Sequence, residues 1–146
     1  MKNTCIEVSI LGIKLHKLFL DIIKVELDIL NTTDINSIQV LTLISVGDST
    51  VTIGELISKG HYMGSNASYN VKKMVDNGYL IQTPSKRDKR ASYVKLSTKG
   101  KNLFETLKNG LSKYTTVFEQ TKENHLKDCI ENIKKINLSW KSILSS

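Results

Sequence analysis

Proline and arginine are scarce in this chain. Its 146 residues include a single proline, and only two of its 21 basic residues are arginine. There is no low-complexity run, and the 40% apolar and 24% charged fractions are typical of a globular chain rather than a disordered one. We therefore expect one folded unit that is long enough to bury a core.

Cysteine and histidine are also too few and too scattered to form a recognisable metal site. Cys5 and Cys129 lie far apart and form no CxxC pair, which argues against a disulfide framework. His16, His61 and His125 show no ligand spacing, so we expect no metal and no cofactor. Two free thiols in a reducing cytoplasm are the simplest interpretation, with oxidant sensing by a thiol as the alternative.

The chain also lacks a long apolar run. The most apolar segment is interrupted by Lys14, Lys17, Asp21 and Lys24, so it is not expected to span a bilayer. The N-terminal residues lead to no sustained apolar stretch and no small-residue cleavage site, so no signal peptide is expected. These absences predict a cytoplasmic protein with no membrane partner.

The basic residues that are present are concentrated in one third of the chain. Residues 52–100 carry nine lysines and arginines against three acidic residues, whereas the rest of the chain carries 12 against 11. A solvated surface explains a mixed charge distribution well and a segregated one poorly. This segregation predicts a partner that carries many phosphates.

Apolar residues at helical spacing predict the first three helices. The first covers about 6–30 and the second about 35–46, with helix-start residues at 31–34. Thr52 is expected to cap a short third helix, with Glu55 as its capping-box partner. The inward positions of the second helix are predicted to be Ile35, Ile38, Leu41 and Val46.

A fourth helix is predicted over 65–78 and has two distinct faces. Ala67, Val71, Met74 and Val75 form one apolar stripe. Gly78 suits a left-handed C-terminal cap. The opposite face and its edge carry side chains that suit contacts with bases and phosphates: Ser65, Asn66, Ser68, Tyr69, Lys72 and Lys73.

Two strands follow the fourth helix, and two long helices end the chain. The strands are "YLIQT" and "ASYVKLS", joined by a projecting loop over 84–90. The long helices are predicted over 98–118 and 120–144. The resulting fold class is mainly α with a small β-hairpin wing, a winged helix-turn-helix.

Several motifs support this fold through a family resemblance. The stretch "DKRASYVKLSTKG" (Asp88–Gly100) resembles the wing signature of the MarR family of bacterial transcription regulators. "INSIQVLTLI" resembles the second-helix motif of that family, "TIGELI" the start of its third helix, and "VKKMVDNGYL" the end of its recognition helix. The segment "GSNASYNVKK" also resembles that of a rhizobial member.

The resemblance implies a MarR-like homodimer that binds double-stranded, pseudo-palindromic operator DNA. It implies a cytoplasmic, nucleoid-associated repressor that responds to a small-molecule effector. Residues 1–33 and 101–146 would form the helical dimerisation region, and residues 34–100 the DNA-binding lobe. By their expected position, the ligand-binding candidates are His16, Phe19, Thr42 and Phe104.

The wing is where both arginines occur. A narrow minor groove favours inserted arginine over the compact, strongly hydrated lysine. The resemblance points to Arg90 as the inserted residue, and Asp88 can hold its guanidinium. The DNA-binding candidates of the wing are Lys86, Arg87, Asp88, Lys89 and Arg90.

Three alternative functional classes are considered, of which the first two stay open. A non-specific architectural DNA binder would use the same basic lobe, and a winged helix can serve as a protein-interaction module without DNA. An enzyme is not expected, because the sequence shows no nucleophile–base arrangement and no phosphate-binding glycine loop.

Overall fold

A computed structural model describes residues 2–58, 66–85, 91–118 and 121–145 of the chain. It divides into two compact units, Met1–Leu111 and Ser112–Ser146. The first unit contains a long helix and a small mixed lobe. The second contains a 3₁₀ segment, η2 (Lys113–Phe118), and one helix, α6 (Glu123–Leu144).

The first unit begins with α1 (Lys2–Ile29) and α2 (Ser37–Val46). α2 starts at Ser37 because Asn36 caps it: the Asn36 side chain accepts a hydrogen bond from Gln39 N at 2.9 Å, and Gln39 Oε1 accepts one from Asn36 N at 3.1 Å. The predicted start residues at 31–34 therefore lie in the connecting turn.

The inward face of α2 differs from the prediction. Ile35 and Val46 are buried as expected, but Ile38 and Leu41 are only half-buried. The helix instead buries Gln39, Val40, Thr42 and Leu43. Apolar residues lie on all sides of this helix, so their spacing alone does not select the buried face.

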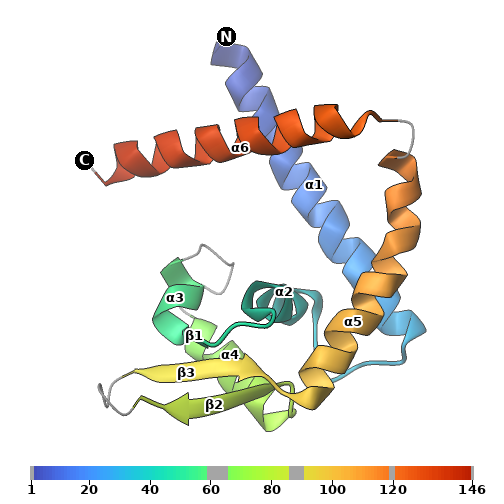
Figure 1. Cartoon of the computed structure of the whole chain (residues 1–146), viewed down its shortest axis with the longest axis vertical. Helices are drawn as coiled ribbons and strands as arrows, with labels where there is room; N and C mark the ends of the chain where they lie inside the picture. The colour runs from blue at the N-terminus through green and yellow to red at the C-terminus, as the bar shows by residue number, and fades with distance from the viewer. Residues whose placement is uncertain (1, 59–65, 86–90, 119–120, 146) are drawn as a thin grey trace. The chain divides into compact units, whose positions relative to one another are not determined.

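The helix-turn-helix and the wing complete the lobe. α3 (Ile53–Ser58) follows Thr52, whose hydroxyl accepts a bond from Glu55 N at 3.1 Å, so the predicted capping box is confirmed. α4 (Ala67–Asp76) is followed by β2 (Leu80–Pro84) and β3 (Ser92–Leu96), and Figure 1 shows the hairpin leading into α5. Val94 and Leu96 are buried, whereas Tyr93 and Lys95 are exposed, as their alternation predicted.

A third strand was not predicted. β1 (Val51–Thr52) pairs with β3 in an antiparallel sheet of order β1–β3–β2, in which Val51 lies opposite Val94. Two residues are too few to show the alternation that identifies a strand. The sheet therefore places one buried face over the core formed by Leu43, Leu56 and their neighbours.

The fifth helix, α5 (Thr98–Ser112), begins where predicted but ends earlier than the expected Phe118. The chain continues as the tighter 3₁₀ segment η2, which a spacing of three to four residues does not distinguish from an α-helix. Within α5, Gly110 lies against the buried Glu26 of α1, where a methyl group would meet the Glu26 carboxylate. A glycine inside this helix thus permits close packing on α1.

Candidate nucleic-acid interface

α4 has the two faces that the sequence predicts. Ala67, Val71 and Met74 are each 1% exposed and anchor the helix on the core of the lobe. Since these residues recur every three to four positions, the opposite side of the helix faces solvent. Asn66, Ser68, Tyr69, Lys72 and Lys73 are all exposed there.

Within the described ranges, the side chains on this exposed face form no hydrogen bond or ion pair with other parts of the protein. Asn66 stands at the N-cap of α4, a position where asparagine normally accepts a backbone hydrogen bond. The Asn66 side chain makes no such capping bond, and Asn66 is exposed. Tyr69 is 66% exposed, and among the described residues Lys72 and Lys73 form no ion pair. This face combines amide, hydroxyl and ammonium donors, the groups that recognise base edges and phosphates.

The inner side of α4 is held by a polar contact as well as by its apolar stripe. Gln39 Nε2 on α2 donates a hydrogen bond to Asn70 Oδ1 on α4 at 3.3 Å. Gln39 is buried and Asn70 is half-buried, so this bond is partly shielded from water and constrains the rotation of α4 relative to α2.

The C-terminal end of α4 is closed by a Schellman motif. Gly78 adopts φ +78°, Tyr79 N donates to Met74 O at 2.8 Å, and Gly78 N donates to Val75 O at 2.9 Å. The predicted glycine cap is therefore confirmed. Ser97 then caps α5 by accepting a bond from Gly100 N at 3.0 Å, and its own N–H bonds to Tyr79 O at 3.0 Å.

Asp34 lies at the centre of a network that the sequence did not indicate. Its carboxylate accepts from Tyr79 Oη at 2.5 Å and pairs with Lys99 Nζ at 2.7 Å, while Asn77 Nδ2 donates to its backbone oxygen at 2.5 Å. The hydrogen bonds from Lys99 and Tyr79 hold the pKa of Asp34 below its ordinary value. Burial, together with the Asp34 carboxylate, raises the pKa of Tyr79.

The base of the wing is well defined, but its basic tip is not among the described residues. β2 and β3 pair from Leu80↔Leu96 to Pro84↔Ser92, and Ser85 N then donates to Ala91 O at 2.9 Å. The predicted contacts of Ser65 at the start of the recognition helix, and of the tip residues, fall outside the described ranges. These tip residues are Lys86, Arg87, Asp88, Lys89 and Arg90.

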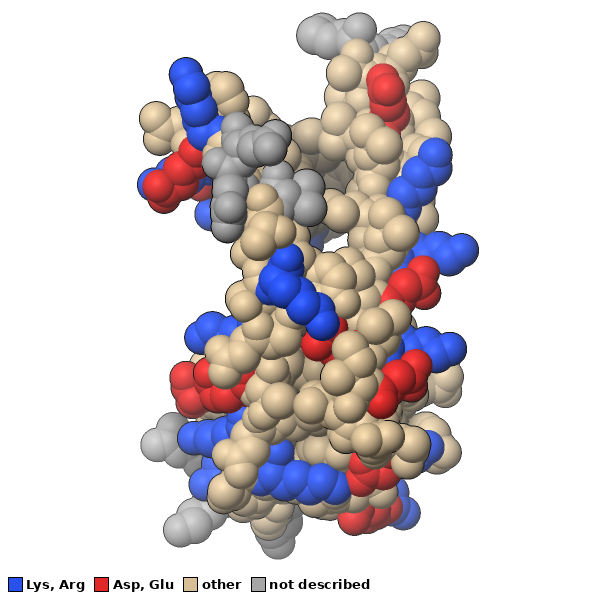
Figure 2. All heavy atoms as spheres, turned by 90° about the vertical axis from the view of Figure 1, so that its right-hand side faces the viewer, with Lys and Arg blue, Asp and Glu red and all other residues tan. Residues whose placement is uncertain are grey.

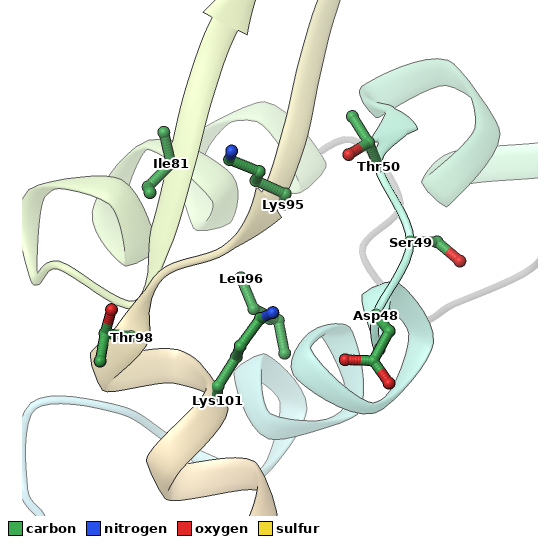
Figure 3. A pocket seen from close by; sticks show the side chains of 9 residues that line it. Asp48, Ser49, Thr50, Ile81, Lys95, Leu96, Thr98 and Lys101 are labelled. Atoms are coloured by element: carbon green, nitrogen blue, oxygen red, sulfur yellow. The ribbon is translucent and has the colours of Figure 1, made fainter.

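The ligand-binding candidates lie in two settings in the first unit. Thr42 is buried, and Phe19 and Phe104 pack partly buried against the core, while His16 is half-buried on α1. None of the four lines the hollow in Figure 3, which has a volume of about 260 Å³. That hollow lies between the turn after α2, β3 and the start of α5, with Asp48, Lys95 and Lys101 among its lining residues.

Charge is mixed on the face that Figure 2 shows. Basic and acidic side chains alternate there and do not form a patch of a single sign. Among the described residues, no group of three or more histidine, cysteine, aspartate or glutamate side chains is placed to hold a metal ion. Cys5 and Cys129 are free thiols, both exposed. No helix within the described ranges has the length and apolar character needed to cross a membrane.

Comparison with family models identifies the lobe. Residues 31–91 match the MarR family model, a span that contains α2, α3, α4 and β2. The chain carries a MarR family domain. The MarR domain includes both the exposed face of α4 and the network around Asp34 up to Tyr79. The expectation that this chain is not an enzyme agrees with its MarR family domain.

A curated relative extends the similarity beyond the MarR domain. The chain is 32% identical over 125 residues to the exopolysaccharide II synthesis transcriptional activator ExpG of Rhizobium meliloti (strain 1021). The matched region covers 84% of this chain and 64% of the relative, so the chain spans less than two thirds of that protein's length.

Solved structures share the fold. A MarR transcriptional regulator from Methanosarcina mazei Go1 superposes with a TM-score of 0.77 at 17% identity, over 93% of this chain and 97% of that one. A mutant MarR from E. coli complexed with operator DNA gives a TM-score of 0.71 at 20% identity, over 92% and 96%. The predicted fold class, a mainly α winged helix with a small sheet, is confirmed.

Proposed function

We propose that this protein is a sequence-specific, DNA-binding transcription regulator in which α4 enters the major groove. The observation that carries the proposal is the exposed face of α4, where the Asn66 side chain makes no capping hydrogen bond and where Lys72 and Lys73 form no ion pair within the described part of the chain. An asparagine amide can bond to two atoms of an adenine edge, and lysines suit phosphates. The MarR domain that contains this face supports the same role.

The proposed regulator binds DNA as a homodimer. The support is the apolar surface of α1 and α6, each considered alone: α1 exposes Ile6, Ile10, Ile13 and Leu18, and α6 exposes Ile130, Ile133, Trp140 and Leu144. A row of exposed apolar side chains along a helix is typical of an association surface. A two-fold dimer would place two α4 helices about 34 Å apart, one turn of DNA, and so read a pseudo-palindromic operator. Residues 1–33 and 101–146 are the proposed dimerisation region, and 34–100 the DNA-binding lobe.

Two further properties, the sign of regulation and the response to a small molecule, rest on the family resemblance alone. The family resemblance predicts a repressor, whereas the curated relative is named an activator. A reporter gene under the selected operator, measured with and without the protein, gives the sign. The same resemblance predicts a small-molecule effector near His16, Phe19, Thr42 and Phe104, and the test for it is release of operator DNA in a ligand screen.

Selection of bound fragments from random DNA tests the proposal. A regulator should enrich one two-fold symmetric site and prefer it by about 10³-fold or more over random sequence. The logarithm of its affinity should fall linearly with the logarithm of the salt concentration, by about 0.9 for each phosphate contact. Strong but sequence-independent binding would instead identify an architectural DNA binder, and a flat salt response would exclude DNA as the partner.

A further inference from the structure

The network around Asp34 joins three segments of the lobe that are distant in sequence. Asp34 lies in the turn between α1 and α2, Asn77 and Tyr79 lie at the end of α4, and Lys99 is in the first turn of α5. The three partners of Asp34, Asn77, Tyr79 and Lys99, are 43, 45 and 65 residues away along the chain. Each contact therefore fixes one element relative to another and does not stabilise a single helix.

Lys99 contacts the three other residues of the network. Its Nζ donates to Asn77 O at 2.9 Å as well as pairing with Asp34, and it lies 4.0 Å from the centre of the Tyr79 ring. Asn77 is the C-cap of α4, so the Lys99 ammonium group bonds to the C-cap carbonyl, at the end of the helix where a cation is favourable. One ammonium group thus contacts the end of α4, the following aromatic ring and the turn before α2.

We propose that Asp34 is a positioning residue for DNA recognition. It holds the C-terminal end of α4 at a fixed angle to α2 and α5. The whole exposed face of α4 then keeps one orientation in the major groove. The inference rests on the proposed function, because it assigns a role to Asp34 within that function. Asp34 itself contacts no DNA in this scheme.

The sign of the charge effect separates positioning from electrostatics. Asp34 carries a negative charge in a basic lobe, so its removal makes the protein more attractive to phosphates at long range. A purely electrostatic binder should therefore bind all DNA more tightly once Asp34 is neutralised. If Asp34 positions α4, the same change should weaken binding to the selected site and leave binding to random DNA unchanged or slightly tighter.

The experiment compares Asp34→Asn with Asp48→Asn in the full chain. Asp48 is exposed in the turn after α2 and forms no hydrogen bond or ion pair among the described residues, so its substitution changes the charge equally without touching the network. Affinity for the selected operator and for random DNA is measured by fluorescence anisotropy at two salt concentrations. We expect Asp34→Asn to lose about three- to fivefold in operator affinity, a modest loss because Asp34 and Lys99 are each about half exposed, and Asp48→Asn to lose none.

Two further variants keep the test decisive. Asp34→Asn combined with Lys99→Met restores the net charge while breaking the network, so operator affinity should stay low with the parent's salt dependence. Tyr79→Phe removes only the hydroxyl that donates to Asp34. If Asp34→Asn proves unfolded by circular dichroism, Tyr79→Phe tests the positioning role in its place. Its operator affinity should fall with no change for random DNA.

Equal operator affinities for Asp34→Asn and Asp48→Asn in folded proteins would overturn the positioning role alone. So would a Tyr79→Phe protein with the parent's operator preference. A parent protein that prefers no sequence would overturn the proposed function, and the positioning role with it.

Discussion

Gln39 on α2 and Asn70 on α4 are joined by a side-chain hydrogen bond of 3.3 Å, with Gln39 only 2% exposed. The other end of the same amide accepts a bond from Asn36 N at 3.1 Å and completes the capping box of α2. One buried side chain therefore both starts α2 and holds α4, so the local structure of one helix is coupled to the orientation of the other.

Replacing this amide by a side chain of similar length should lower stability. Gln39→Met keeps most of the volume but leaves Asn36 N and Asn70 Oδ1 without their partner, and we expect the free energy of unfolding to fall by about 1–3 kcal/mol. Urea denaturation measures it. Gln82→Met, at an exposed position on β2, is the control and should change little. Equal stability of the two variants would mean that the Gln39 bonds contribute nothing net.

Gly100 should not tolerate a side chain. A methyl group there would overlap the carbonyl oxygen of Tyr79, because the first turn of α5 lies directly on that backbone. We expect Gly100→Ala to lower the free energy of unfolding by about 1–3 kcal/mol, the cost of forced backbone shifts. In contrast, Gly54→Ala on α3, where the nearest atom is 3.8 Å away, should raise it by about 0.5–1 kcal/mol. Thermal unfolding of the pair tests this contrast, and a stable Gly100→Ala protein would contradict it.

The residues on the exposed face of α4 should fall into two groups, those that contact bases and those that contact phosphates. Asn66→Ala should relax sequence preference at one base pair of each half-site, by about 1–3 kcal/mol. Lys73→Ala should instead weaken all sequences alike and reduce the salt slope. Competition binding against operators with single substitutions distinguishes the two. The reverse pattern would show that the face of α4 is rotated relative to the groove.

Association should depend on the apolar stripe of α6. Ile133 is 51% exposed in the single chain, so Ile133→Asp should not unfold the protomer, but it would place a carboxylate in an apolar contact at a cost of several kcal/mol. We expect monomers in sedimentation experiments and loss of binding to the full palindrome. Asn132→Asp adds the same charge one position away and should stay dimeric. A dimeric Ile133→Asp protein would remove α6 from the interface.

The pH dependence of stability should reveal the Asp34 network. The folded pKa of Asp34 lies below its ordinary value of 3.8, so its stabilising effect is fully present above that value and is lost as the pH falls through the folded pKa. Because Asp34 and Lys99 are 44% and 49% exposed, the effect should be at most about 1 kcal/mol. The gap in unfolding free energy between the parent and Asp34→Asn should therefore be present at neutral pH and shrink in strong acid. A gap that grows in acid would contradict this assignment.

The features that sequence predicted correctly depend on neighbouring residues. The Thr52–Glu55 capping box, the Gly78 cap and the alternation of Val94 and Leu96 with exposed neighbours each follow from a few consecutive positions. The stripe of Ala67, Val71 and Met74 belongs to the same class, and it was sufficient to identify the exposed face of α4.

The features that sequence missed depend on distant partners. β1 exists because Val51 pairs with Val94, and the buried face of α2 is selected by what packs on it. Asp34 was assigned to a helix start because aspartate favours such positions, whereas its carboxylate bonds to Tyr79 and Lys99. Spacing along the chain carries no information about contacts of that range.

The antiparallel register of the wing limits how its length can vary. Because Val94 and Leu96 face the core and Lys95 faces solvent, inserting one residue within β3 would exchange the two sets and bury a lysine. Beyond the closing bond between Ser85 and Ala91, an added or deleted residue would leave this parity intact. Insertions and deletions among homologues should therefore collect between residues 85 and 91, so that the tip, the proposed DNA contact of the wing, can diverge in length while the strands that carry it cannot.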